Sequence, residues 1–255
     1  GHAKQRIGDG RYIGVTEPGI IAAESPNPIV NQLVIMPDME KRLEAFVRIA
    51  HAIVIFPGGV GTAEEFLFLL GILLHERNRE LPLPVVLTGP ASSEPYFSQI
   101  HEFIGATLGR EAQQRYRICI GNPANVAATL REGMRQVRDF RHSKNDAYYF
   151  NWRLHLDMDF QQPFHATHEN MAGLVLHRGQ EPARLAASLR KAFSGMVAGN
   201  VKDEGIRAIE SRGPFELSGD RDIMSRLDRL LGAFVAQNRM KLPGRAYQPC
   251  YRLVV

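Results

Sequence analysis

A glycine-rich turn followed by a threonine and two glutamates is the segment of this sequence best suited to chemistry. It runs Pro57-Gly58-Gly59-Val60-Gly61-Thr62-Ala63-Glu64-Glu65. The glycines let the backbone turn tightly and approach a ligand without interference from a Cβ atom. Where such a turn opens a helix, the free N–H groups form an anion site, and we expect a phosphate there. The spacing matches neither a Walker A loop nor the dinucleotide-binding G-x-G-x-x-G pattern.

The threonine and the second glutamate also have a purely structural interpretation. Thr62 and Glu65 fit the S/T-x-x-E capping box, in which the threonine caps the helix and the glutamate reaches back to its N–H group. Arg42, near the start of the preceding predicted helix, favours a functional interpretation instead. Neighbouring strand ends of a parallel sheet converge on one crevice, so we expect Arg42 and Glu65 to face one ligand. The alternative for Arg42 is a solvated surface position, the usual place for arginine.

Strands that alternate with helices must position these residues. The run Ala52–Phe56 is apolar at every position, which indicates a strand buried on both faces, as in a parallel sheet. Further strands are predicted at 12–15, 33–36, 84–88 and 116–121, and helices from 37 and at 62–76, 96–108 and 124–140. This order predicts right-handed βαβ units and an α/β fold with a Rossmann-like, doubly wound parallel sheet.

The sequence changes character near residue 141, where the polar run His142–Asp146 suits a domain boundary. Apolar and polar residues then alternate strictly over Phe150–Phe160, which predicts a strand with one solvated face. Helices near 182–198 and 220–241 follow, and 250–255 is predicted to be a last strand. We therefore predict a Rossmann-like catalytic domain at 1–141 and a C-terminal α+β region at 142–255.

Composition narrows the class of protein. The 255 residues are 44% hydrophobic and 23% charged, with a formal net charge of +4, which excludes disordered, collagenous and disulfide-stapled chains. The two distant cysteines, Cys119 and Cys250, suit a reducing compartment. The most apolar runs fall short of the roughly 20 residues that span a bilayer. We expect a cytoplasmic protein that binds neither membrane nor nucleic acid.

Two further clusters of residues have compositions that occur in binding sites. His165 and His168 stand three residues apart, whereas zinc-binding helices place histidines at i and i+4, so we predict a structural role and no metal. A stripe of basic residues follows helical spacing, and its simplest interpretation is a solvated helix face. The stripe consists of Arg131, Arg135, Arg138, Arg141 and Lys144.

The spacing of the arginine and the glycine-rich turn resembles a known family. Met39-x-x-Arg42 followed by Pro57-Gly-Gly-x-Gly-Thr-x-x-Glu65 is similar to the signature of the Lonely Guy family of nucleotide phosphoribohydrolases, often mislabelled lysine decarboxylases. A closer resemblance, to the bacterial nucleoside-5′-monophosphate nucleosidases of that superfamily, covers essentially the whole chain. The stretches that carry it are 27–60, 168–171, 192–195, 198–202 and 240–244.

The chain departs from the resembled proteins at two places. Leu43 stands where many members of the wider family have a lysine, which puts a secondary contact in doubt. The chain also opens with Gly1-His2-Ala3 and no initiator Met. The resembled nucleosidases have an N-terminal region and a first strand with its own glycine-rich turn. We therefore expect this chain to be a piece of a longer one that lacks the first strand–turn unit.

The resemblance implies an activity like that of AMP nucleosidases, hydrolysis of the N-glycosidic bond of a nucleoside 5′-monophosphate. Glu65 would stabilise the oxocarbenium-like ribose and orient the attacking water. Arg42 would supply a fixed charge or hydrogen-bond donors near the phosphate or the departing base, and neither a metal nor another cofactor is implied. The phosphate would lie against Gly58, Gly59, Gly61 and Thr62, with Glu64 and Glu24 as further substrate contacts.

The resemblance also implies partners and leaves rival functions to weigh. It implies a homo-oligomer, a dimer or tetramer, and an alarmone of the guanosine tetraphosphate type, for which the basic stripe is the candidate site. The main rival is a carrier or sensor that holds a nucleotide on the same fold without cleaving it. Amino-acid decarboxylation is disfavoured because no lysine adjoins the glycine-rich turn to form a Schiff base.

Overall fold

Parallel strands and helices alternate along the chain in the computed structural model, which describes residues 10–23, 25–242 and 246–254. The strands are β1 Ile13–Thr16, β2 Gln32–Ile35, β3 Ile53–Ile55, β4 Val85–Gly89, β5 Arg117–Ile120, β6 Val175–Leu176, β7 Phe215–Gly219 and β8 Tyr251–Leu253. The α-helices are α1 Pro18–Ala23, α2 Met39–Ile49, α3 Val60–Leu74, α4 Glu94–Thr107, α5 Arg110–Gln113, α6 Pro123–Ser143, α7 His168–Ala172, α8 Pro182–Val201, α9 Asp203–Arg212 and α10 Arg221–Ala236. The predicted α/β class is confirmed.

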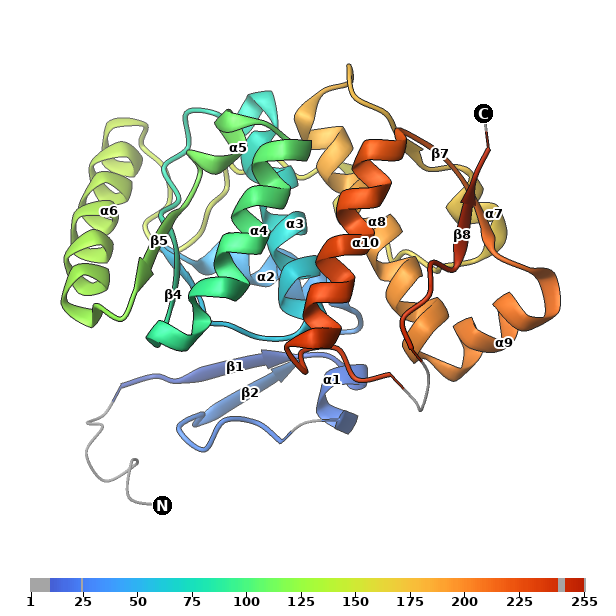
Figure 1. The fold of residues 1–255 in the computed structure, drawn as a ribbon. Helices are drawn as coiled ribbons and strands as arrows, with labels where there is room; N and C mark the ends of the chain where they lie inside the picture. Colours follow the sequence, from blue (N-terminus) through green and yellow to red (C-terminus); the bar gives the residue numbers. More distant parts are fainter. Residues whose placement is uncertain (1–9, 24, 243–245, 255) are drawn as a thin grey trace.

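The strands form three small parallel sheets within the described residues (Figure 1). β1 pairs with β2, the orders of the other two sheets are β3-β4-β5 and β6-β7-β8, and every pairing is parallel. Helix α6 lies on one side of the β3-β4-β5 sheet and helices α3 and α4 lie on the other (Figure 1). Helices on both faces of a parallel sheet give the Rossmann-like arrangement that the sequence predicts.

Strand β3 departs from its prediction. Its residues are half-buried, not buried on both faces, because β3 is an edge strand of its sheet in the described part of the chain. Phe56, directly after it, is 65% exposed. The continuous apolar run therefore identified a strand correctly. It overstated the length of the strand, which is Ile53–Ile55, and the burial of its residues.

One hydrophobic core runs through both predicted regions. Helix α3 is buried along almost its whole length and packs against α8 of the C-terminal region. Phe68 of α3 meets Phe160 edge-on at 5.1 Å between ring centroids. The boundary predicted at residue 141 falls inside the last turn of α6. Elements on either side of that boundary are thus held by a shared core, and the C-terminal helices can support residues of the N-terminal half.

The strand predicted at 150–160 is wrong. Residues 150–157 form no ladder with another strand, and a 3-10 turn occupies Met158–Phe160. Side chains satisfy the backbone instead: Asn78 exchanges hydrogen bonds of 2.7 and 2.8 Å with the backbone of His155, and Arg48 donates to the carbonyl of Asn151 at 2.9 Å. The apolar alternation is buried only in part: Leu154, Leu156 and Phe160 are buried, whereas Trp152 and Met158 are 69% and 62% exposed.

The basic stripe on α6 is divided by the fold. Arg141 is buried, and its guanidinium donates to the carbonyl of Tyr148 at 2.6 Å and to Nε2 of His51 at 3.1 Å. The expectation of a fully solvated stripe is therefore wrong for Arg141. Arg135 is exposed and pairs with Glu132 at 2.8 Å, while Arg131 and Arg138 are exposed.

None of the helices in the described residues is long and apolar enough to cross a membrane.

Candidate active site

The glycine-rich turn connects β3 to α3, at the carboxyl end of the strand. Helix α3 begins at Val60, two residues earlier than predicted, with Gly59 as its N-cap residue. Gly59 has no side chain, so the start of α3 has no hydrogen bond from the side chain of its N-cap residue. The first N–H groups of an α-helix lack intrahelical partners, so they are available to an anion here.

Two of the three glycines are required by close packing. A Cβ atom on Gly58 would overlap the hydroxyl group of Thr62, and one on Gly59 would lie 2.7 Å from the carbonyl oxygen of Arg239. Gly61 differs, because a Cβ atom there would meet nothing within 4 Å. Gly61 is also exposed, so the space beside it is open to a ligand.

Residues from distant parts of the chain hold the turn in place. Nη1 of Arg239, which follows α10, donates to the carbonyl oxygen of Gly58 at 2.8 Å. The same guanidinium lies 4.5 Å from the ring centroid of Tyr96 on α4. Burial raises the pKa of Tyr96 to about 12, so its hydroxyl stays protonated and donates to the carbonyl of Gly59 at 3.2 Å. Sequence reasoning missed both residues; the one available signal was that Arg239 adjoins the resembling stretch 240–244.

Arg42 and Glu65 are brought together as predicted. Asp38 caps α2 by accepting from the backbone N–H of Lys41 at 2.7 Å, which starts the helix at Met39. Nη2 of Arg42 then donates to Oε1 of Glu65 on α3. The Arg42 side chain is buried, whereas that of Glu65 is 31% exposed. The pair therefore presents a carboxylate to the outside, backed by a buried positive charge.

The capping-box interpretation of this segment does not hold. Thr62 lies inside the first turn of α3 and is not its cap, and Glu65 pairs with Arg42 instead of reaching back to the helix start. Thr62 and Glu65 both line an open groove of about 580 Å³ between α2, β3 and α3. Apart from these two side chains, the groove is lined by apolar residues such as Phe46, Ile55 and Phe68.

Glu64 points away from this pair. The Glu64 side chain is buried, and its Oε1 lies 3.7 Å from Nη1 of Arg190 on α8. Burial raises the pKa of Glu64, although the nearby positive charge of Arg190 opposes that rise. The placement supports a structural role for Glu64 and not the substrate contact predicted for it. Glu24 lies outside the described residues.

The raised pKa of Glu64 predicts a pH dependence of stability. A carboxyl group whose pKa is higher in the folded state contributes fully below its ordinary pKa of 4.5, and that contribution is lost as the pH rises through the raised value. Glu64→Gln should remove this loss, so its Tm should fall less than that of the unmodified protein between pH 5 and pH 8. Thermal unfolding across this range tests it, with the exposed Glu102→Gln as control. Parallel Tm curves for Glu64→Gln and the unmodified protein would contradict the prediction.

One group of side chains within the described residues has the composition of a metal site. His75, His155 and Asp157 offer ligand atoms that all lie within 4.8 Å of one another. Their hydrogen bonds oppose metal binding, because Nδ1 of His75 accepts from the backbone N–H of Arg77 at 3.1 Å. Nδ1 of His155 lies 3.2 Å from Nη1 of Arg77, which can only donate. A neutral imidazole that accepts at Nδ1 carries its proton on Nε2, and both Nε2 atoms face Asp157.

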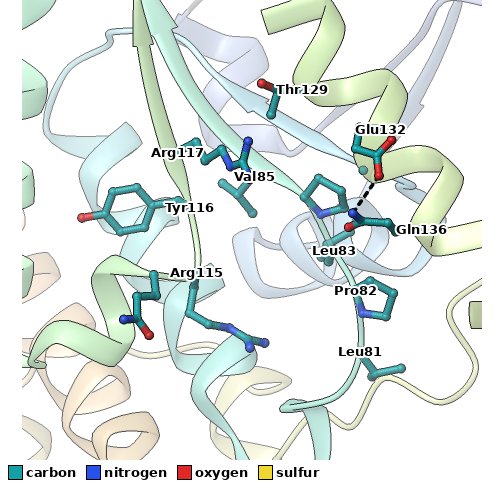
Figure 2. A pocket seen from close by; sticks show the side chains of 13 residues that line it. Leu81, Pro82, Leu83, Val85, Arg115, Tyr116, Arg117, Thr129, Glu132 and Gln136 are labelled. Atoms are coloured by element: carbon teal, nitrogen blue, oxygen red, sulfur yellow. Dashed lines mark hydrogen bonds between the residues drawn. The ribbon is translucent and has the colours of Figure 1, made fainter. Parts of the chain in front are cut away.

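Two other features of the chain lie away from the candidate site. His168 packs against Phe215, and its Nε2 lies 2.8 Å from the carbonyl oxygen of Gly213, which gives it a structural contact. A hollow of about 230 Å³ lies at the amino ends of β4 and β5 (Figure 2). In it Gln136 donates to Glu132 at 3.0 Å, the bond dashed in Figure 2. This hollow contains none of the predicted site residues and lies at the opposite end of β4 from the one facing the glycine-rich turn.

The fold and the site together define a parallel α/β protein with a glycine-rich, anion-accepting turn beside an arginine–glutamate pair. Comparison with known families assigns residues 2–130 to the family described as "Possible lysine decarboxylase". The chain belongs to that family. Residues 134–254 match a second family model, described as "Pyrimidine/purine nucleotide monophosphate nucleosidase, C-terminal".

Similar proteins carry the second of these names. The chain is 58% identical over 253 residues to the pyrimidine/purine nucleotide 5′-monophosphate nucleosidase of Escherichia coli (strain K12). The proteins of the same name from Escherichia coli O6:H1 and O157:H7 match equally well. The alignment covers 99% of this chain and 56% of each relative, so the chain spans little more than half the length of these relatives.

Proposed function

We propose that the protein hydrolyses the N-glycosidic bond of nucleoside 5′-monophosphates and releases the free base and ribose 5-phosphate. The observation that carries the proposal is the Arg42–Glu65 pair next to the uncapped N-terminus of α3. Bond cleavage builds positive, oxocarbenium-like charge on the ribose, and a fixed carboxylate stabilises that charge and orients water. The name of the Escherichia coli relatives supports the same reaction.

Each part of the site has a distinct role in this proposal. The 5′-phosphate lies against the free N–H groups at the start of α3, in the space beside Gly61 and near Thr62. Glu65 faces C1′ of the ribose, and Arg42 fixes the Glu65 carboxylate through its hydrogen bond. Nε of Arg42 is buried without a protein partner in the described residues, and a buried donor of this kind calls for a partner such as an ordered water.

A nucleotide carrier or sensor without catalysis is the rival function. A pure phosphate carrier gains nothing from a partly exposed carboxylate beside its anion site, because like charges repel. The decarboxylase named by the family description needs a lysine to form a Schiff base. The lysine next to Arg42, Lys41, is instead paired with Glu44 at 2.9 Å. The glycosidase therefore remains the better supported function.

The test is incubation of the intact protein with AMP, GMP, CMP and UMP, followed by chromatography for free base. Release of base from at least one nucleotide, with equimolar ribose 5-phosphate, is the expected result. Nucleotide binding without any base release would overturn the proposal and favour the carrier. Release of carbon dioxide from lysine in a parallel incubation would favour the decarboxylase.

Partners and location complete the proposal. A homo-oligomer and a cytoplasmic location agree with the resemblance, and the buried free thiols Cys119 and Cys250 suit a reducing compartment. An alarmone site on α6 would have to use the exposed Arg131 and Arg138, since Arg141 is engaged with Tyr148. Binding of guanosine tetraphosphate to the unmodified protein and to the Arg131→Ala/Arg138→Ala variant would test that site, since the variant should bind it more weakly.

A further inference from the structure

A buried arginine from the C-terminal half lies beneath the candidate active site. Arg190 of α8 is 1% exposed, although arginine is among the residues least often buried completely. Its Nη1 lies 2.9 Å from Oε1 of Glu40 on α2 and 3.7 Å from Oε1 of Glu64 on α3. One side chain thus bridges the two helices that carry Arg42 and Glu65, over 126 to 150 positions of sequence.

The residues of this bridge are one or two positions from the reactive pair on each helix. Glu40 is two residues before Arg42, and Glu64 directly precedes Glu65. Residues so close in a helix point to different sides of it, so one side of each helix faces Arg190 while the other presents Arg42 and Glu65. A change in the rotation or spacing of either helix at the bridge must therefore displace the reactive pair as well.

The charges around the bridge balance when Glu64 is neutral. Burial favours the protonated form of Glu64, which leaves Arg190 and Glu40 as an ion pair of opposite charge. Besides Arg190, the groups that act on Glu64 are Glu40, Lys202 and the hydroxyl of Ser194. Buried ion pairs often add little stability compared with apolar residues of the same size. A role in geometry explains the pair better than a role in stability.

We propose that Arg190 is a positioning residue, which sets the relative placement of α2 and α3 so that Arg42 and Glu65 meet in the active site. This inference rests on the proposed function, because its readout is the rate of base release. Phosphate binding depends mainly on backbone N–H groups at the start of α3, whereas the chemical step depends on the Arg42–Glu65 geometry. Loss of Arg190 therefore lowers kcat more than it raises KM.

The experiment compares Arg190→Met and Arg190→Lys with the intact protein, using the nucleotide that releases base fastest. Arg190→Met should lower kcat at least about tenfold, change KM less than about threefold and shift the pH profile of kcat. Arg190→Lys should recover only part of kcat. Its ammonium group can pair with Glu40, but it lacks the planar guanidinium that reaches Glu40 and Glu64 together. The control is Arg184→Met on the exposed side of the same helix, which should leave kcat and KM unchanged.

A double variant separates positioning from stability. Arg190→Met leaves Glu40 buried without its partner, which lowers Tm, and Arg190→Met/Glu40→Gln removes that unpaired charge. The double variant should regain Tm without regaining kcat. Recovery of kcat together with Tm, or an unchanged kcat and pH profile in Arg190→Met, would overturn the positioning role. If the unmodified protein releases no base from any nucleotide, the proposed function fails first and this inference fails with it.

Discussion

Glu65→Gln is expected to lower kcat for base release by about 100- to 10,000-fold, the range typical for loss of a catalytic carboxylate. Glutamine has nearly the same shape, and its amide oxygen can still accept from Nη2 of Arg42. The helices therefore stay in place, and the variant removes the negative charge that faces the developing positive charge of the ribose. KM and nucleotide affinity should change little, because the proposed phosphate contacts are the N–H groups at the start of α3.

Steady-state chromatography of free base and calorimetric titration of the nucleotide give the two measurements. Glu44→Gln is the matched control, since Glu44 lies on α2 and pairs with Lys41 and Arg48 away from Glu65. It should retain full activity. An active Glu65→Gln enzyme would show that the carboxylate takes no part in the chemical step. A large loss of affinity without a change in kcat would assign Glu65 to binding.

Gly61→Ala should raise KM by about 10- to 100-fold while leaving the protein at least as stable as before. The added methyl group meets no protein atom within 4 Å, and alanine is favoured over glycine inside a helix by roughly 1 kcal/mol. The same methyl group occupies the space in which the phosphate would approach the N–H groups of α3. Hydrogen bonds to a charged group contribute about 1.5 to 3 kcal/mol each, and losing one accounts for this rise in KM.

Two other glycines make this prediction specific. Gly232→Ala, in α10, also places a methyl group where nothing lies within 4 Å, and it should leave KM unchanged while Tm stays the same or rises. Gly58→Ala should lower Tm, because its methyl group would overlap the hydroxyl of Thr62. If Gly61→Ala binds nucleotide normally, the phosphate does not lie at the start of α3, and the assignment of this turn is wrong.

Much of the site could be predicted because its signals are local in sequence. The turn follows from three glycines between an apolar run and a helical pattern, and the start of α2 follows from the Asp38 cap. The pairing of Arg42 with Glu65 required one further rule, that neighbouring parallel strands end at a common crevice. Such rules depend on short spacings that a single sequence displays directly.

The rest of the site depends on contacts between distant segments. Arg190 appears in the sequence as one basic residue in an amphipathic helix, and only the packing of α8 against α3 buries it beside Glu64. Arg239 likewise reaches the turn because the end of α10 lies next to Gly59. The strand expected at 150–160 is absent for the same reason: a strand needs a neighbouring backbone as well as an alternating sequence, and the side chain of Asn78 takes the place of that backbone.

The half-buried edge of β3 has a practical consequence for handling these 255 residues. Within the described residues β3 pairs on one edge only, with β4, and its other edge lies next to an apolar groove and the exposed ring of Phe56, so it offers backbone hydrogen bonds and apolar surface together. Surfaces of that kind promote association between copies through strand addition. Light scattering against protein concentration would reveal such self-association. Assays should therefore use dilute protein. Aggregates formed through β3 would cover the groove that Glu65 lines, and the lower rate would be mistaken for a loss of catalytic activity.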